Sequence, residues 1–133
     1  MSALPSIRSL TLAPAVLGLA ACVALPQPFS QIDGHRYHLA PIDTYAVQIV
    51  RIDDRDTLDD PVFVEPGLRR VTVQGPGGIH RFGEQRVIEL NVAPCTRYHL
   101  VAVKTTRLAT DFSVRVDQQE PIGGGCRGAP ASK

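Results

Sequence analysis

The sequence feature that most restricts the fold is an alternation of apolar and polar side chains that recurs along the chain. Successive side chains of a β-strand point to opposite faces, so each such run predicts a strand with one buried and one solvated face. The run at residues 98–103 is largely apolar on both faces, which favours a central strand. The alternating runs are residues 45–50, 70–74, 87–92 and 112–117.

Turn-forming residues separate these runs, and no segment after Cys22 shows the 3.6-residue period of a helix. Eleven Gly and eleven Pro are many for 133 residues. The turn segments lie at residues 53–61, 65–67, 75–78 and 93–94. Three shorter strands are expected at residues 35–40, 62–64 and 79–82. The whole pattern predicts an all-β domain, a small antiparallel Ig-like β-sandwich of six to eight strands over residues 35–126.

The N-terminal residues 1–21 have a different character. They contain one charged side chain, Arg8, followed by an apolar run of small and aliphatic residues that ends at Ala21. That run is too short to cross a hydrocarbon core of about 30 Å as a helix. A weakly basic start followed by a short apolar run is typical of a secretory signal peptide.

The end of this run, Leu19-Ala20-Ala21-Cys22, resembles the lipobox of bacterial lipoproteins. In that class the cysteine becomes the first residue of the mature chain and carries the lipid, so the resemblance implies a membrane anchor at Cys22. Two or three acyl chains anchor a protein stably, whereas one does so only marginally. The alternative is a signal peptide that is cut elsewhere, for instance after Ala24.

The lipobox resemblance also implies a location. It predicts a lipid-anchored protein of the bacterial cell envelope, and Val23 in place of an Asp favours the outer membrane, facing the periplasm. We expect residues 22–34 to form the lipidated cysteine and an extended tether, because Pro26 and Pro28 favour an extended path. Residues 127–133 are expected to be a disordered tail.

The three cysteines then divide into an anchor and a pair. With Cys22 assigned to the lipid, Cys95 and Cys126 remain, and one disulfide is the expected arrangement in an oxidising compartment. Closing a loop of about 32 residues would stabilise the fold by roughly 3–4 kcal/mol. The alternative is a redox or metal-binding thiol pair, although no CxxC spacing is present.

A second resemblance concerns the domain itself. Residues 64–73, in which Pro66-Gly67 precedes an alternating strand, resemble the turn-and-strand element of PEGA-type and transthyretin-like envelope domains. Residues 90–98 resemble the later strand, turn and Tyr-containing strand. Over residues 44–126 the chain is similar to small bacterial lipoproteins, which implies a fold and an envelope location. This resemblance carries no catalytic residues, and the cysteine pair departs from the PEGA pattern.

The sequence contains no catalytic constellation. Ser30 and Ser113 lack the G-x-S-x-G context of a nucleophile elbow. The acidic loop at residues 53–60 lacks the order of an EF-hand, so we interpret it as solvated, with a Ca²⁺-sensing module as the alternative. His35 and His38 are three apart, which on a strand places them on opposite faces, wrong for one metal. We therefore expect no metal and no cofactor.

The charge balance bears on the partner. Fourteen Lys and Arg, one of them Arg8, leave thirteen after the signal peptide against thirteen Asp and Glu, which excludes a nucleic-acid partner. Arginines on or beside the expected strands are interpreted as solvating and pairing with nearby acids, with an Arg-lined face for anionic groups as the alternative. The arginines are Arg69, Arg86, Arg97 and Arg115, and the acids are Glu84, Glu89 and Asp117.

The function predicted from these features is a non-catalytic, lipid-anchored envelope module that binds a protein partner, since an open sheet edge can accept a partner's strand. The alternative is a periplasmic enzyme or small-ligand carrier. Its pocket would combine His80, His99 and Tyr98 across strands.

Overall fold

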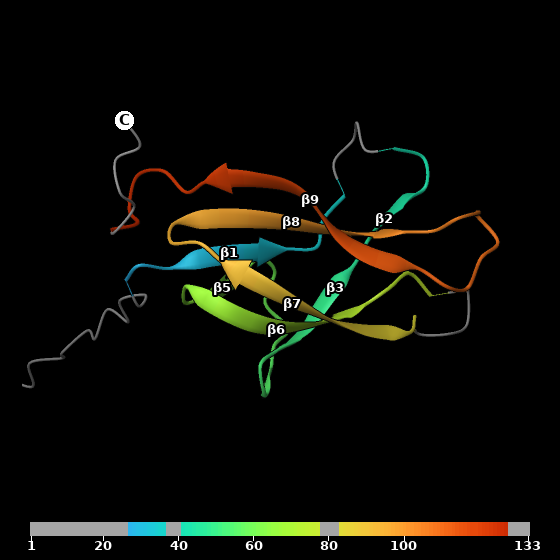
Figure 1. The fold of residues 1–133 in the computed structure, drawn as a ribbon, viewed down its shortest axis with the longest axis horizontal. Helices are drawn as coiled ribbons and strands as arrows, with labels where there is room; N and C mark the ends of the chain where they lie inside the picture. The colour runs from blue at the N-terminus through green and yellow to red at the C-terminus, as the bar shows by residue number, and fades with distance from the viewer. Residues whose placement is uncertain (1–26, 37–40, 78–82, 128–133) are drawn as a thin grey trace, which may run out of the picture.

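The computed structural model describes residues 27–36, 41–77 and 83–127, which form nine strands and no helix. The strands pack as two sheets into a small all-β sandwich, as the alternation predicts (Figure 1). The expected signal peptide, Cys22 and the expected strand at residues 79–82 lie outside the described residues, as do residues 37–40 of another expected strand. The strands are β1 (Ser30–Asp33), β2 (Thr44–Ala46), β3 (Gln48–Ile52), β4 (Arg55–Asp56), β5 (Val62–Val64), β6 (Gly67–Gln74), β7 (Gln85–Val92), β8 (Thr96–Val103) and β9 (Ser113–Pro121).

The first sheet is built around β8. Strand β9 pairs with β8 along its whole length, while β1 and β2 pair with successive parts of β8 and therefore share its other edge. Strand β5 extends the sheet beyond β1. The β1–β8 pair is parallel, whereas every other pair among the described strands is antiparallel, so the sheet is mixed where a purely antiparallel one is predicted.

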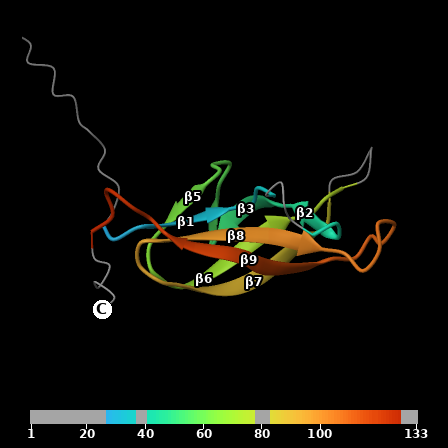
Figure 2. The ribbon, with the colours of Figure 1, turned by 90° about the horizontal axis from the view of Figure 1, so that it is seen from above.

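The second sheet has the order β4-β3-β6-β7 and is antiparallel throughout. Strands β6 and β7 pair over eight positions each, from Gly67↔Val92 to Gln74↔Gln85. In both views the green segment that connects β3 to β5 projects from the body of the sandwich (Figures 1 and 2). This projecting segment contains the acidic residues 53–60.

The core lies between the two sheets and consists mainly of their inward-facing apolar residues. On β8 these are Tyr98, Leu100 and Ala102, all at most 3% exposed. Aliphatic side chains from both sheets and Phe112 close around them: Ile32, Val47, Ile49, Val62, Val64, Val71, Val73, Leu90 and Val92. Each such side chain stabilises the fold by roughly 1.5–3 kcal/mol through removal of apolar surface from water.

The expected tether at residues 22–34 is wrong over its last part, because β1 lies within it. Strand β1 pairs with β5 and β8, Ile32 is fully buried and Phe29 is 7% exposed. An extended tether and a β-strand have similar backbone conformations. Ser30–Asp33 contains a single strongly apolar residue, so its sequence shows no alternation that would predict a strand. The domain therefore begins before residue 35.

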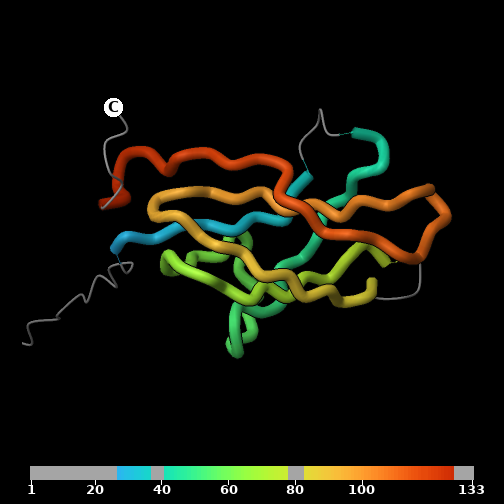
Figure 3. Tube along the Cα trace, viewed as in Figure 1, coloured from blue at the N-terminus to red at the C-terminus, as the bar shows by residue number. Residues whose placement is uncertain are grey.

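The Cys95–Cys126 disulfide is confirmed, with the two Cα atoms 5.6 Å apart. It joins the turn between β7 and β8 to the segment after β9, where Ile122 N–H donates to Cys95 O at 2.8 Å. Arg127, the first residue of the predicted tail, donates its backbone N–H to Gln27 Oε1 at 2.8 Å. The described chain therefore begins and ends at the same end of the sandwich, as Figure 3 shows.

The buried hydroxyl of Ser30 fastens β1 to the same turn. It donates to Ala93 O at 2.6 Å and accepts from Thr96 N–H at 3.1 Å, and the side chain is fully buried. The Tyr98 hydroxyl accepts from Ala93 N–H at 2.8 Å. These bonds satisfy backbone groups that would otherwise lose water without compensation.

Within the described ranges, no helix is long and apolar enough to cross a membrane.

Candidate functional site

A groove of about 510 Å³ lies where the edge strands of the two sheets, β4 and β5, approach each other. The β3–β4 hairpin forms one wall, since Ile52 pairs with Arg55 and leaves Asp53 and Asp54 as the turn. We call this feature the acidic groove. Its lining residues are Ile52, Asp53, Asp54, Arg55, Asp56, Thr57, Asp59, Val62, Phe63, Val64, Glu65 and Arg69.

Two charged side chains shape the wall of the acidic groove. Asp53 has a positive φ of 52°, which Asp tolerates better than most residues, and its Oδ1 accepts Arg70 N–H at 2.9 Å. Its Oδ2 accepts from Arg69 Nη1 at 3.1 Å. The backbone hydrogen bond from Arg70, reinforced by Arg69, holds the pKa of Asp53 below its ordinary value, so it is ionised at neutral pH.

The lining as a whole is acidic and contains the aromatic side chain of Phe63. Five carboxylates against two guanidiniums give the lining a net charge of −3. Phe63, on the edge strand β5, is 43% exposed and contacts Phe29 edge-to-face with ring centroids 5.5 Å apart. The acidic loop at residues 53–60, interpreted from the sequence as solvated, thus forms part of a charged groove.

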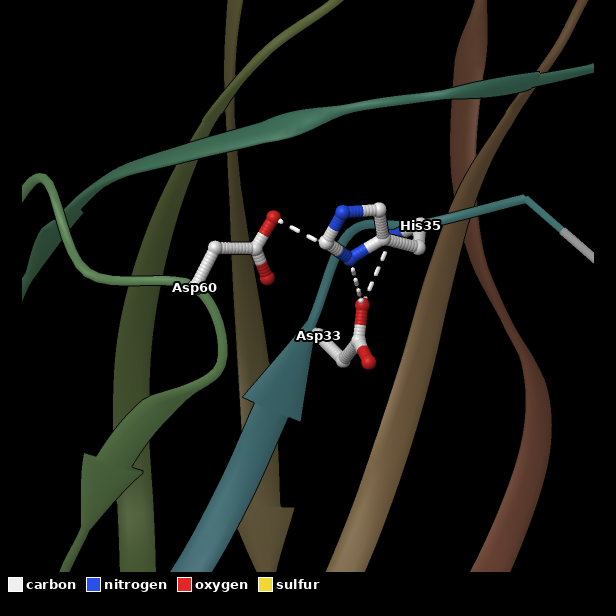
Figure 4. Close-up of side chains that lie close together, drawn as sticks. All are labelled: Asp33, His35 and Asp60. Carbon is white, nitrogen blue, oxygen red and sulfur yellow. Dashed lines mark hydrogen bonds and ion pairs between the residues drawn. The ribbon is translucent and has the colours of Figure 1, made fainter.

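A second cluster lies at the end of β1 (Figure 4), and we call it the Asp-His-Asp cluster: Asp33, His35 and Asp60. Nδ1 of His35 lies 2.9 Å from Asp33 Oδ1 and 3.3 Å from Asp60 Oδ2. The hydrogen bond with Asp33 and the negative charges of Asp60 and Asp33 raise the pKa of His35. The carboxylates therefore create a position that favours positive charge.

His99, which lies next to Asp33 of this cluster, is buried on the outward face of β8. It is 2% exposed, its Nδ1 lies 3.6 Å from Asp33 Oδ2 and its Nε2 lies 3.2 Å from Glu120 Oε1. The hydrogen bond with His99 lowers the pKa of Glu120. Arg97 extends the network by contacting Glu120 Oε1 at 3.2 Å.

The structure separates two of the three residues of the alternative pocket. Tyr98 packs into the core, whereas its neighbour His99 points to the opposite face of β8 and contacts Asp33 and Glu120. The third residue, His80, lies outside the described residues, as does His38. Ser30 is committed to the turn at residues 93–96, so its hydroxyl is occupied by structural hydrogen bonds.

The four arginines that the sequence singles out each contact an acid rather than forming a bare cationic face. Two of the acids are the expected partners Glu84, which contacts Arg86 at 3.0 Å, and Asp117, which contacts Arg115 at 3.3 Å. The other pairs are Arg69–Asp53 and Arg97–Glu120. Exposed pairs of this kind contribute little stability and mainly solvate the surface.

Sequence reasoning missed the Asp-His-Asp cluster because His35 was compared only with His38. The partners of His35 are Asp33, two residues before it, and Asp60, which the β1–β5 pairing brings alongside. The available signal was the Asp-x-His spacing. No protein-family model matches the chain, and searches of curated proteins and of solved structures found no similar protein.

Proposed function

We propose that the chain is a lipid-anchored binding module of the bacterial cell envelope that holds a basic, extended segment of a partner protein in its acidic groove. The single observation that carries this proposal is the groove itself, an acid-lined depression between two sheet edges. The lipid anchor rests on the lipobox resemblance at Cys22.

The charge of the groove selects the partner's chemistry. A lining of net charge −3 attracts a basic segment and repels an acidic one, so it contributes specificity and association rate. Strand β5 pairs on one side with β1, and as the last strand of the sheet it offers an edge for an added strand. Phe63, exposed on this strand, supplies an apolar contact for such a segment.

The anchor would hold the domain close to the membrane. Gln27 donates to Gly125 O at 3.3 Å and accepts from Arg127 N–H, so this residue is already held against the domain. Only residues 23–26 separate Gln27 from Cys22. At 3.3–3.6 Å per residue the link spans at most about 18 Å. A tether over all of residues 22–34 would reach about 40 Å.

Binding of a short fluorescent peptide of alternating Lys and Val to the purified chain tests the groove. We expect saturable binding that weakens as NaCl concentration rises, because exposed charges are screened. The double variant Asp54→Asn/Asp59→Asn should bind roughly three- to tenfold more weakly. Fluorescence anisotropy measures both effects.

The matched control is Asp43→Asn/Glu84→Gln, which changes the net charge equally at exposed acids outside the groove. This variant should bind the peptide as the wild type does. Equal weakening in both variants would mean that the net charge, and not the groove, attracts the peptide, and the proposal would then be wrong. Absence of saturable binding would also contradict it.

A further inference from the structure

We infer that the Asp-His-Asp cluster is a binding site for one divalent transition-metal cation of the Zn²⁺ type. The site is separate from the acidic groove, whose lining does not include any of the three residues. Its ligands would be Nδ1 of His35 and one carboxylate oxygen each from Asp33 and Asp60. The metal would take the place of the Nδ1 proton.

The distances between the ligand atoms are close to those of a tetrahedral site. Zn²⁺ binds imidazole nitrogen and carboxylate oxygen at about 2.0–2.2 Å, so neighbouring ligands of a tetrahedron lie about 3.3–3.6 Å apart. Nδ1 of His35 lies 2.9 Å from the oxygen of Asp33 and 3.3 Å from that of Asp60. All three ligand atoms lie within 4.8 Å of one another. Small side-chain movements are therefore enough to bind the cation.

The backbone holds the three ligands in place. The antiparallel pairing of β1 with β5 ends at Ile32↔Val62, and the chain beyond it places Oδ2 of Asp60 3.3 Å from Nδ1 of His35. Gly34 accepts Val47 N–H at 2.9 Å, and a Cβ at this position would lie 2.0 Å from Val47 O, so only glycine fits. The segment between Asp33 and His35 is thus fixed, and less ordering is needed on binding.

The buried His99 provides an independent argument for this site. Its Nδ1 faces Asp33 Oδ2, the carboxylate oxygen opposite the one that faces His35. His99 is in turn held by Glu120. Metal-ligating carboxylates are usually oriented by such an outer shell of polar groups. A solvated surface ion pair does not need this support, whereas a metal ligand benefits from it.

The donor set selects the type of metal. One imidazole nitrogen with two carboxylate oxygens suits Zn²⁺, and three protein ligands leave a fourth position for water or for a donor from a partner. Ca²⁺ prefers six to eight oxygen ligands, which this cluster does not supply. The site should therefore prefer Zn²⁺ to Ca²⁺.

Isothermal titration of the purified chain, carrying no histidine tag, with ZnCl₂ tests the inference. We expect one equivalent of Zn²⁺ to bind and the thermal unfolding midpoint to rise, because a ligand of the folded state stabilises it. His35→Ala and Asp60→Asn should each weaken binding at least about tenfold, since losing even a supporting group costs that much. CaCl₂ should give no comparable binding.

Asp43→Asn is the matched control, because it removes an exposed carboxylate that belongs neither to the cluster nor to the acidic groove. It should leave the zinc affinity unchanged. Unchanged affinity in His35→Ala, or equal loss in Asp43→Asn, would overturn the assignment, as would the absence of saturable binding. His35 is 71% exposed, so its variant is expected to fold, and Asp60→Asn provides a second, independent test.

Discussion

Two turns of this molecule share a backbone feature but are stabilised in opposite ways. Cys95 and Asp53 both adopt a positive φ, 53° and 52°, at positions where L-residues are uncommon. Cys95 is 3% exposed and is held by the disulfide and by hydrogen bonds to neighbouring segments. Asp53 is held at the surface by Arg69 and the backbone of Arg70.

If the proposed function is correct, the difference separates stability from recognition. At the turn around Cys95, polar groups are buried and hydrogen-bonded to each other. The loss of one partner therefore leaves the other group buried with neither a protein nor a water molecule to hydrogen-bond. At the turn around Asp53, the charges remain near water and line the acidic groove, where Asp54 is exposed. We therefore expect substitutions at the first turn to affect unfolding strongly, and those at the second to affect unfolding only slightly and to act mainly on binding.

The largest effect is expected from the disulfide. The double variant Cys95→Ser/Cys126→Ser should lose roughly 3–4 kcal/mol of unfolding free energy, because the unfolded chain gains the freedom of a loop of about 32 residues. Urea denaturation measures the loss. Reductant should destabilise the wild type and leave the variant unchanged. A variant as stable as the oxidised wild type would mean that this turn does not carry the stability.

Ser30→Ala should have the next largest effect. It removes the acceptor of Thr96 N–H and the donor to Ala93 O in a fully buried position, which costs about 1–3 kcal/mol. The same substitution at Ser113, which is exposed on β9, should change the stability by less than about 0.5 kcal/mol. Equal effects at both positions in urea denaturation would contradict the contrast between buried and exposed polar groups.

Asp53→Asn should have the smallest effect and should depend on pH. The pKa of Asp53 is lower in the folded than in the unfolded chain, so its charge stabilises the fold above the ordinary value of 3.8. That contribution disappears as the pH falls through the folded pKa. We expect a loss of about 0.2–1 kcal/mol at pH 7, typical of an exposed pair, that vanishes in acid. Thermal unfolding of both proteins across pH 2–7 measures it, and a pH-independent difference would contradict it.

The sequence was sufficient to predict the sandwich because the pattern that predicts a strand lies within the strand itself. Alternation in β6 and β7 and the continuous apolar run of β8 identified the strands that form most of the core, and the cysteine count identified the bridge. Strand β1 was missed because Ile32 is its only strongly aliphatic residue and its pairing with β8 is parallel and distant in sequence. Local patterns carry no information about such a partner.

The candidate sites depend on contacts between segments that are distant in sequence. The acidic groove forms because β4 and β5, which belong to different sheets, lie near each other, whereas the sequence shows only a run of acids. The Asp-His-Asp cluster needs the β1–β5 register to bring Asp60 to His35. Residue types were therefore predictable at both sites, and their geometry was not.

The central claim, a membrane-anchored binding module, depends first on the lipid at Cys22. The most direct test is incorporation of labelled palmitate into the chain expressed in bacteria, compared between the wild type and Cys22→Ala. We predict labelling of the wild type, its loss in the variant, and release of the variant from the membrane fraction. Equal labelling of the two, or no labelling of the wild type, would contradict the claim.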